Sequence, residues 1–316
     1  MKQALTKIKQ ALAQHGIVEA FTQYRIEGGE ISAYNGRFTA SCPIDNTSLA
    51  FAVPGREFEA LVSRLPEDAA LSVADSVLRL KAGRQHGTIK LLPLSDATQP
   101  RPSAQWRTPP ASLIPALQAA RPFISDNAVY QWALCASLES GLVRATNNVC
   151  LVEAMAAGLD ATGQLLPLWV IDYLLSRDES LTGFQLTDSH VSFKWSDDSW
   201  MRAQLVDGAF PEVTRTVFEQ FLQPAWAIPA EWKQAYRTVA ELSAEAVTIA
   251  PAALSGGHGA ATIEHEIETP VAEEVKFNPK FLTSVIETAT HWEPSAYPRP
   301  TPFAAPGLRG FVIGRR

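Results

Sequence analysis

The residues in this sequence best suited to chemistry are the histidines and glutamates between residues 258 and 268. Imidazole and carboxylate groups at short spacing are typical of metal sites. The run 263–268 reads IEHEIE, however, and its alternation of Ile and Glu is typical of a β-strand. Glu264, Glu266 and Glu268 then share one strand face while His265 points to the other, so strand geometry disperses the ligands. We therefore predict a solvated strand here, with no metal and no cofactor.

Motifs of nucleophilic and phosphate chemistry are absent. The sequence has no recognisable Ser-His-Asp, G-x-S-x-G or G-x-x-x-x-G-K-[ST] pattern. A hydrolase would need such a constellation, so we predict a protein that is not an enzyme. Eight tryptophans could form a stacking platform for single-stranded nucleic acid, but they are scattered along the chain. We expect most of them in the core or in hairpins.

Composition points to a soluble, intracellular globular protein of several domains. The 316 residues are enough for roughly two to three domains. The chain is 46% hydrophobic and carries a net charge of −6, which argues against a generally basic nucleic-acid binder. Its three cysteines show no C-x-x-C spacing, as expected in a reducing compartment. Lysines interrupt the first 16 residues, so we expect no signal peptide, and no run reaches the ~18 apolar residues of a membrane span.

The helices and strands predicted from the sequence recur along the chain. In both 53–91 and 166–205, a proline (Pro54, Pro167) opens a short amphipathic helix ending in Ser-Arg. Each helix is followed by two runs of alternating residues, 71–73 and 78–80 in the first segment and 184–186 and 191–193 in the second. An Asp-Ser turn joins the two runs of each segment. Such alternation predicts half-buried antiparallel strands. The repeated unit is thus a helix followed by a hairpin.

Upstream segments repeat at the same distance. The run 29–33 lies 112 residues before 141–145, and amphipathic helices are predicted over 3–15 and 111–121. A third copy starts near Pro229, with helices over 230–241 and from Asn278. Pro54 and Pro167 are 113 residues apart, and Pro167 and Asn278 are 111 apart. We therefore predict three tandem α+β domains, each with two helices on antiparallel sheets, over residues 1–108, 109–223 and 224–316.

Proline-rich stretches mark the domain boundaries. Residues 96–110 and 222–229 are predicted linkers. Residues 294–306 carry five prolines, and we expect no interior strand there because proline cannot donate a ladder hydrogen bond.

Several motifs resemble one known family, the bacterial DNA sliding clamp (DNA polymerase III beta subunit). The run 53–71, followed by 78–94, resembles the family's first-domain signature, which includes a Leu-Pro-Glu turn. LVDGAFPE at 205–212 resembles the sequence that closes the second domain. FNPKFL at 277–282 resembles the third-domain Phe-Asn-x-x-Tyr-Leu, and 311–313 resembles the last strand.

The resemblance implies a head-to-tail homodimer whose six similar domains form a ring around double-stranded DNA. Such a ring holds duplex DNA without reading its sequence, and an ATP-driven clamp loader opens it. DNA polymerase and other partners bind through short apolar peptides. The implied function is that of a processivity factor in the cytoplasm, associated with the nucleoid.

The ring predicts a basic inner wall made of the helices. The six helix windows carry ten Lys and Arg against six Asp and Glu, a net +4 on a chain of −6, which leaves −10 elsewhere. A basic lining attracts phosphates without reading bases. The cations expected to face DNA are Lys7, Lys9, Arg56, Arg64, Arg121, Arg177, Lys233, Arg237 and Lys280.

The resemblance also implies a partner-peptide pocket and a dimer seam. The expected pocket residues are Thr146, Asn148, Val149, Cys150, Leu151, Asn278, Phe281, Val312, Ile313 and Gly314. The family's Thr-Asp-Gly-His-Arg-Leu is TNNVCL here, so the polar rim of the pocket is altered, and Gly314-Arg315-Arg316 replaces the usual tail. Glu241 and Leu242 stand where the family has an apolar pair at the seam.

These departures indicate a divergent clamp, and the hypothesis that follows is an origin in a phage or another mobile element. A second interpretation stays open: a clamp-fold adaptor or decoy that binds proteins and does not close on DNA. Neutralising the helix cations separates the two, because only a clamp that encircles DNA depends on them.

Overall fold

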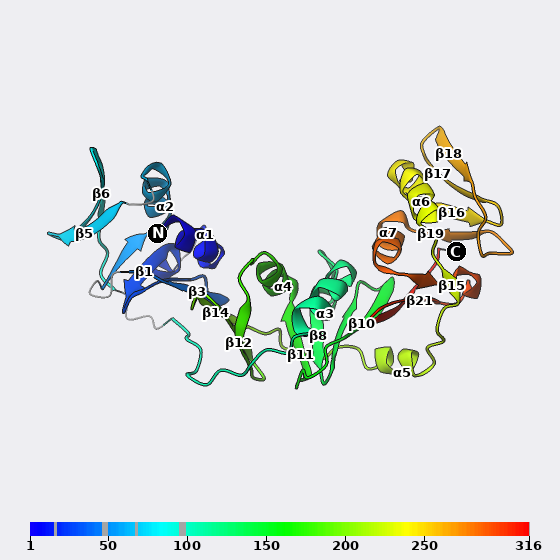
Figure 1. Cartoon of the computed structure of the whole chain (residues 1–316), viewed down its shortest axis with the longest axis horizontal. Coiled ribbons are helices and arrows are strands. Elements are labelled where there is room, and N and C mark those ends of the chain that lie inside the picture. The colour runs from blue at the N-terminus through cyan, green and yellow to red at the C-terminus, as the bar shows by residue number, and fades with distance from the viewer. Residues whose placement is uncertain (16–17, 46–49, 67–68, 95–98, 316) are drawn as a thin grey trace. The chain divides into compact units, whose positions relative to one another are not determined.

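The computed structural model describes residues 1–15, 18–45, 50–66, 69–94 and 99–315. The chain divides into two compact units, one of Met1–Pro109 with Arg177–Leu205 and one of Pro110–Ser176 with Val206–Arg316. Both contain helices and antiparallel sheets, which confirms the predicted α+β class (Figure 1). Glu67 of the predicted Leu-Pro-Glu turn, residues 96–98 of the first linker and Arg316 lie outside the described residues.

As the sequence predicted, two helices and antiparallel strands recur in three copies. The order in each copy is a helix, four strands, a second helix and three strands (Figure 1). The first copy contains α1 (Lys2–Ile8), β1 (Gln23–Glu27), β2 (Glu30–Tyr34), β3 (Phe38–Pro43), β4 (Phe51–Pro54), α2 (Gly55–Arg64), β5 (Ala70–Ala74), β6 (Val77–Ala82) and β7 (Gln85–Lys90). The second contains α3 (Leu113–Ala120), β8 (Cys135–Glu139), β9 (Leu142–Thr146), β10 (Cys150–Met155), β11 (Thr162–Pro167), α4 (Leu168–Leu175), β12 (Leu181–Leu186), β13 (His190–Trp195) and β14 (Trp200–Gln204).

The third copy contains α6 (Ala230–Leu242), β16 (Val247–Ala250), β17 (Ala253–His258), β18 (Ala261–Glu266), β19 (Val275–Phe277), α7 (Pro279–Thr288), β20 (His291–Trp292), β21 (Thr301–Ala305) and β22 (Leu308–Val312). Between the second and third copies lie α5 (Val213–Glu219) and β15 (Trp226–Ala227). Short 3-10 helices occupy Lys9–Ala11, Glu19–Thr22, Arg121–Phe123, Gln131–Leu134 and Pro294–Ala296.

Local sequence accounts for the second helix and the hairpin of each copy. Pro54, Pro167 and Asn278 are the N-cap residues, and the side chain of Asn278 accepts a hydrogen bond from the Lys280 backbone N–H at 3.0 Å. Asp75 and Ser76 both have positive φ, the geometry of a tight hairpin turn, and β5 and β6 pair antiparallel as predicted.

The first helix is shorter than predicted. The pattern predicted a helix over 3–15, but α1 ends at Ile8 and continues only as a 3-10 turn to Ala11. Leu12 is extended and buried, and the Ala13 N–H bonds to the Phe21 carbonyl at 2.9 Å. This contact ends the helix because it turns the chain toward β1.

Strand pairing joins each copy to the next. The four-stranded segments have the orders β3-β2-β1-β4, β10-β9-β8-β11 and β18-β17-β16-β19. The three-stranded segments are β5-β6-β7, β12-β13-β14 and β22-β21-β20. β14 pairs with β3 in a seven-stranded sheet of the first unit, and β22 pairs with β10 in an eight-stranded sheet of the second.

The expectation that 294–306 holds no interior strand is wrong, because β21 lies between β20 and β22. Pro302 is within β21, and its carbonyl accepts from the Glu293 N–H at 2.9 Å. The N–H that proline lacks would point to the same side as that carbonyl. This side faces the end of the two-residue β20. The missing N–H therefore removes no hydrogen bond from the pairing of β21 with β22.

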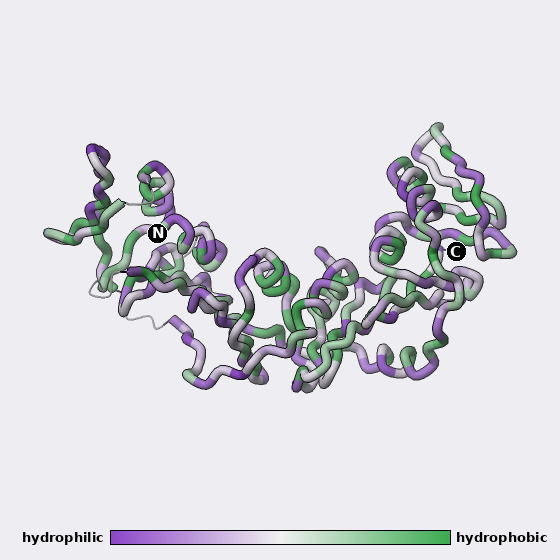
Figure 2. The backbone as a smooth tube through the Cα atoms, viewed as in Figure 1, coloured by the Kyte–Doolittle hydropathy of each residue, from purple (hydrophilic) through white to green (hydrophobic). Residues whose placement is uncertain are grey.

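The core confirms the expectation for tryptophan. Trp195, Trp232 and Trp292 are fully buried, Trp200 is nearly so, and the other four are half-buried. Figure 2 shows α4 as a mainly hydrophobic helix, consistent with its sequence LWVIDYLL. Among the described residues, no helix is long and apolar enough to cross a membrane.

The described end of the first linker runs along the outer edge of β12. Arg107 and Phe184 exchange two backbone hydrogen bonds, of 3.1 and 2.9 Å. The ring of Trp106 lies against Gly183, where a Cβ atom would come within 2.8 Å of the ring. A side chain at position 183 would therefore displace the linker.

A buried ion-pair network crosses the eight-stranded sheet. Glu153 on β10, whose side chain is 1% exposed, accepts hydrogen bonds from Arg144 on β9 at 2.6 Å and from Arg309 on β22 at 2.6 and 2.8 Å. Arg144 also binds Glu139 on β8 at 3.0 Å. Three neighbouring copy-two strands and one copy-three strand are thus tied together by charge.

We expect Glu153→Gln to destabilise this sheet by about 3–5 kcal/mol, because Arg309 loses its carboxylate and the buried Arg144 keeps only that of Glu139. Calorimetric melting of the full chain measures the effect. Glu212→Gln, an exposed acid in the same unit, is the matched control and should melt like the wild type. Equal melting of the two variants would show that the network adds no stability.

Candidate functional site

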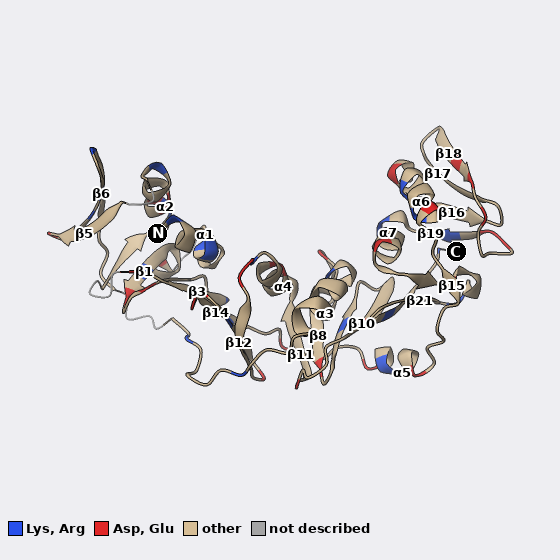
Figure 3. Cartoon of the chain, in the orientation of Figure 1, with Lys and Arg blue, Asp and Glu red and all other residues tan. Residues whose placement is uncertain are grey.

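Most of the predicted cations lie on helices that pack in pairs, α1 with α2, α3 with α4 and α6 with α7, or on the 3-10 turn directly after one. Arg177 is an exception, because α4 ends at Leu175 and Arg177 lies in the loop before β12. On the first pair, Lys9, Arg56 and Arg64 are exposed. Figure 3 shows blue Lys and Arg segments on α1 and α2. Nη2 of Arg56 lies 3.2 Å from Nε2 of His15. Within the described part of the chain, Lys9 and Arg64 form no ion pair. These three cations are therefore available to a polyanion.

Two other predicted cations are held in an ion-pair cluster. Nζ of Lys7 lies 2.5 Å from carboxylate oxygens of both Glu179 and Asp197. The guanidinium of Arg177 binds Glu179 at 2.8 Å, lies 4.3 Å from the ring centroid of Trp195, and has a side chain only 6% exposed. The cluster connects α1 to the loops flanking β12 and β13. Arg177 is therefore placed to hold these elements together rather than to face solvent.

Charge balance in this cluster shifts the pKa values of its members. Burial alone would raise the pKa of Glu179 and Asp197, but hydrogen bonds from Lys7, and from Arg177 or Ser199, lower both below their ordinary values. Burial lowers the pKa of Lys7, yet its bonds to the two carboxylates outweigh this and raise it. The cluster is therefore fully charged near neutral pH.

The helix cations of the second and third copies are largely paired across their own helix pair. Arg121 binds Asp172 of α4 at 2.9 Å, and Arg237 binds Glu287 of α7 at 2.7 Å. Nζ of Lys233 donates to the Ala289 carbonyl at 2.7 Å, and burial lowers its pKa. These contacts reduce the positive charge that the two pairs present.

A cavity of about 480 Å³ lies in the second unit, lined by the loop after α3, the β9–β10 turn and the start of α7. Val129 and Tyr130 on its wall are 94% and 60% exposed, which is unusual for such large apolar groups. Tyr130 stacks on Trp132, with ring centroids 5.4 Å apart. Phe281, Arg121, Lys280 and Asp126 also line the cavity. The cavity thus combines apolar anchors with two cations.

Of the residues expected in the peptide pocket, Asn148 and Phe281 line this cavity. Asn148 has a φ of 69°, and the preceding Asn147 accepts two backbone hydrogen bonds that hold the turn. Ile313 is 49% exposed, and its N–H bonds to the Val149 carbonyl. The other expected residues do not line the cavity: Thr146, Val149, Cys150, Leu151, Asn278, Val312, Ile313 and Gly314.

Sequence reasoning missed Val129, Tyr130 and Ser284 in this wall. The run DNAVY at 126–130 held a usable signal, because two apolar residues directly follow turn-forming Asp and Asn. Glu241 and Leu242, expected at the seam, lie at the C-terminal end of α6 and are exposed.

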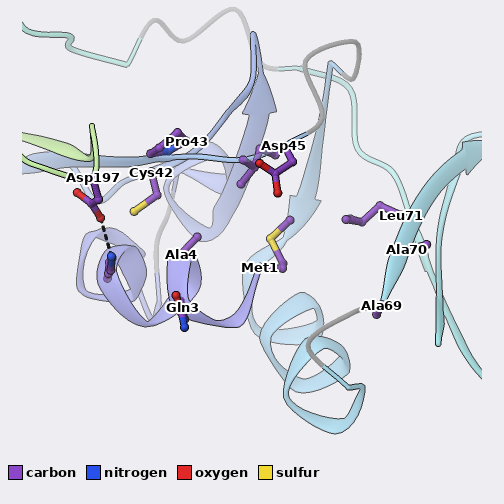
Figure 4. Close-up of a pocket in the computed structure, with 12 residues that line it drawn as sticks. Met1, Gln3, Ala4, Cys42, Pro43, Asp45, Ala69, Ala70, Leu71 and Asp197 are labelled. Carbon is purple, nitrogen blue, oxygen red and sulfur yellow. Dashed lines mark hydrogen bonds and ion pairs between the residues drawn. The ribbon is translucent and has the colours of Figure 1, made fainter.

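A second cavity, of about 530 Å³, lies in the first unit beside α1 (Figure 4). Its wall includes Cys42 and the bonded pair of Lys7 and Asp197, marked by the dashed line. Burial raises the pKa of the Cys42 thiol to about 12, which leaves it inert as a nucleophile. No three His, Cys, Asp or Glu side chains among the described residues converge as metal ligands.

Comparison with known proteins identifies the fold. No family model and no curated protein matches the sequence. Among solved structures, a Helicobacter pylori beta clamp in complex with 3,4-difluorobenzamide matches with a TM-score of 0.80 at 13% identity, covering 100% of this chain and 97% of that one. A Caulobacter crescentus DNA polymerase sliding clamp matches with a TM-score of 0.79 at 19% identity and the same coverage. The chain has the fold of the bacterial sliding clamps.

The resemblance read from the sequence is thereby confirmed at the level of the fold. A further Helicobacter pylori clamp, bound to a DNA ligase peptide, matches with a TM-score of 0.78 at 14% identity and covers 100% of this chain and 97% of that one. Identities of this size describe a divergent sequence on a clamp fold.

We expect Lys7→Met to lower the stability of the first unit by about 1–2 kcal/mol at pH 7, because Glu179 and Asp197 lose their shared donor. Both carboxyl pKa values are lowered in the folded state, so their contribution is present above about pH 4 and is lost as pH falls through the folded values. The difference between wild type and variant should therefore shrink toward pH 3. Melting curves at the two pH values measure this, with the exposed Lys9→Met as control. A deficit that is equal at both pH values would contradict the ionic origin.

Proposed function

We propose that this chain is a non-catalytic DNA sliding clamp, which encircles duplex DNA as a head-to-tail homodimer and tethers a DNA polymerase. The observation that carries the proposal is the strand pairing between copies. It pairs β3 with β14 and β10 with β22, but leaves the outer edges of β7 in the first copy and of β18 in the third unpaired among the described residues. A second chain supplies the missing partner for each, so two chains close on each other.

The exposed helix cations support contact with DNA. Lys9, Arg56 and Arg64 project from a helix pair and can attract phosphates through solvent. No base-reading element is needed, because a tether that slides must hold every sequence equally. Arg177 is better explained as a support for this surface, given its burial and its bond to Glu179.

The second-unit cavity supports the binding of short peptides. Its exposed Val129 and Tyr130, with Phe281, offer anchor sites for apolar side chains. The polymerase and the clamp loader are the partners proposed for it. The same proposal includes a cytoplasmic location, a phage origin and the domain bounds 1–108, 109–223 and 224–316.

One observation favours the adaptor alternative. Arg121 and Arg237 are neutralised by acids of their own helix pairs, so two of the three pairs offer less positive charge than the sequence predicts. A clamp-fold adaptor would keep the peptide cavity and have no need of basic helices.

Retention on closed DNA separates the two functions. We expect the protein to co-elute with nicked circular duplex on a large-pore column and to be released when the circle is linearised, because a ring leaves DNA only at an end. Lys9→Glu with Arg64→Glu should abolish retention, while Arg37→Glu with Arg299→Glu, the same charge change at other exposed sites, should not. Absence of wild-type retention on both DNA forms would favour the adaptor.

We expect Phe281→Ala to weaken binding of the DNA ligase peptide of the Helicobacter pylori complex at least tenfold, about 1.4 kcal/mol, because an apolar anchor loses its contact. Fluorescence polarisation with the labelled peptide measures this. Val213→Ala, a 65% exposed apolar residue outside the cavity, is the control. Equal affinity for both variants would place peptide binding elsewhere.

A further inference from the structure

Both linkers add backbone to the outer edge of a three-stranded segment, in the copy that each linker precedes. In the first linker, Arg107 exchanges two hydrogen bonds with Phe184 of β12, at 3.1 and 2.9 Å. In the second linker, β15 pairs antiparallel with β20, with Trp226 opposite Trp292. On their other side, Phe184 and Trp292 each pair with a phenylalanine of the next strand, so they hold equivalent positions. Each linker also places a tryptophan beside the edge that it covers, Trp106 or Trp226.

The matching position in the first copy is Leu71 on β5, the first of its three final strands. The fourth residues of β6 and β13 are Leu80 and Phe193, and they pair with Leu71 and Phe184 respectively. Among the described residues, no segment pairs with the outer edge of β5. Phe184 is 5% exposed, whereas Leu71 is half-buried. The first copy therefore lacks the cover that a linker gives the second, and an uncovered strand edge is a template for another chain.

The cavity of about 530 Å³ in the first unit lies beside this uncovered edge. Ala69, Ala70 and Leu71 line it from the β5 side, and Met1 and Ala4 line it from the start of α1 (Figure 4). Each linker enters the first helix of its copy shortly after covering the edge strand. A cover for β5 would therefore run through the space between β5 and the start of α1, where the cavity lies. The volume of the cavity is within the usual range of binding sites.

In the third copy, aromatic rings fill the corresponding place. The ring centroid of Trp226 in the linker lies 5.3 Å from that of Trp232 on α6 and 6.5 Å from that of Trp292 on β20. Trp232 is the third residue after the N-cap of α6, and Ala4 is the third residue after the N-cap of α1. The first copy thus has Ala4 and Leu71 where the third copy has two tryptophans. These smaller side chains leave the space open.

The groups on the cavity wall favour an apolar occupant over an anion. Lys7 lines the cavity, but its Nζ is already bound to Glu179 and Asp197 at 2.5 Å. Burial raises the pKa of the Cys42 thiol to about 12, so this group is neutral at pH 7. An anion would have to compete with two carboxylates for Lys7, whereas an aromatic ring needs only contact with the apolar part of the wall.

We propose that the β5 edge and this cavity form a docking site for an extended segment of a partner protein, which adds a strand beside Leu71 and inserts an aromatic side chain, above all tryptophan, into the cavity. Main-chain hydrogen bonds supply affinity in this mode of binding, and the side-chain pocket supplies specificity. Val73, which is 37% exposed and on the same face of β5 as Leu71, extends the apolar contact. The site belongs to the first unit and does not depend on the proposed ring.

The test is fluorescence polarisation with a labelled peptide that copies the second linker, LQPAWAIP (222–229), titrated with the full chain. We expect saturable binding, and we expect the peptide with Trp226→Ala to bind about tenfold more weakly, because it has no ring to place in the cavity. A peptide N-methylated at Trp226 should lose as much affinity, because it lacks the backbone donor that Arg107 uses at the equivalent position. Absence of saturable binding overturns the proposal, and so does equal binding of the three peptides.

Variants of the chain locate the site. Leu71→Glu places a charge in the cavity and should weaken binding of the peptide by about tenfold or more. Ser72→Glu, an exposed position on the opposite face of the same strand, is the matched control and should bind like the wild type. Phe281→Ala alters the cavity of the second unit and should also leave the affinity unchanged. Circular dichroism verifies that each variant is folded. A loss of binding in Phe281→Ala, with Leu71→Glu unaffected, overturns the proposal and assigns the peptide to the other cavity.

Discussion

The backbone N–H and C=O groups along the edge of a strand need hydrogen-bond partners. The architecture of this chain depends on how neighbouring copies supply those partners to each other. The second and third copies each end in three strands whose last strand pairs with the four-stranded segment of the copy before it: β14 with β3 and β22 with β10. These two joints assemble the large sheets on which the helix pairs rest. The exposed cations of α1 and α2, and the cavity beside α7, take their places from that framework.

The repeat and the hairpins were accessible from the sequence because they are local. A proline before a helix, an Asp-Ser turn and period-two alternation each act within about ten residues. The joints were not accessible, since Ser41 pairs with Trp200 from the following copy. The expectation that 294–306 holds no interior strand was wrong for the same reason. Whether a proline fits into a strand depends on which neighbouring strand faces the N–H that proline lacks, and for Pro302 that neighbour is the short β20.

For the candidate site, residue type was predictable and pairing was not. Lys9, Arg56 and Arg64 are as exposed as the helix pattern predicted, but Arg177 is buried against Trp195. The acids that neutralise the other helix cations lie about 50 residues away in the sequence, on the partner helix of the same pair. Tyr130 was missed because a family motif directed attention to the β9–β10 turn and not to the loop that faces it.

The distance between joined strands has a consequence during synthesis. Ser41 meets its partner only when residue 200 has been made, and Cys150 must wait for Val312. At ribosomal speeds of about 5–20 residues per second, each edge stays open for roughly 8 to 32 seconds on the nascent chain. During that interval β3 and β10 are templates for wrong strand pairing. Translation rate and chaperone access thus govern the yield of correctly folded chains as directly as native stability does.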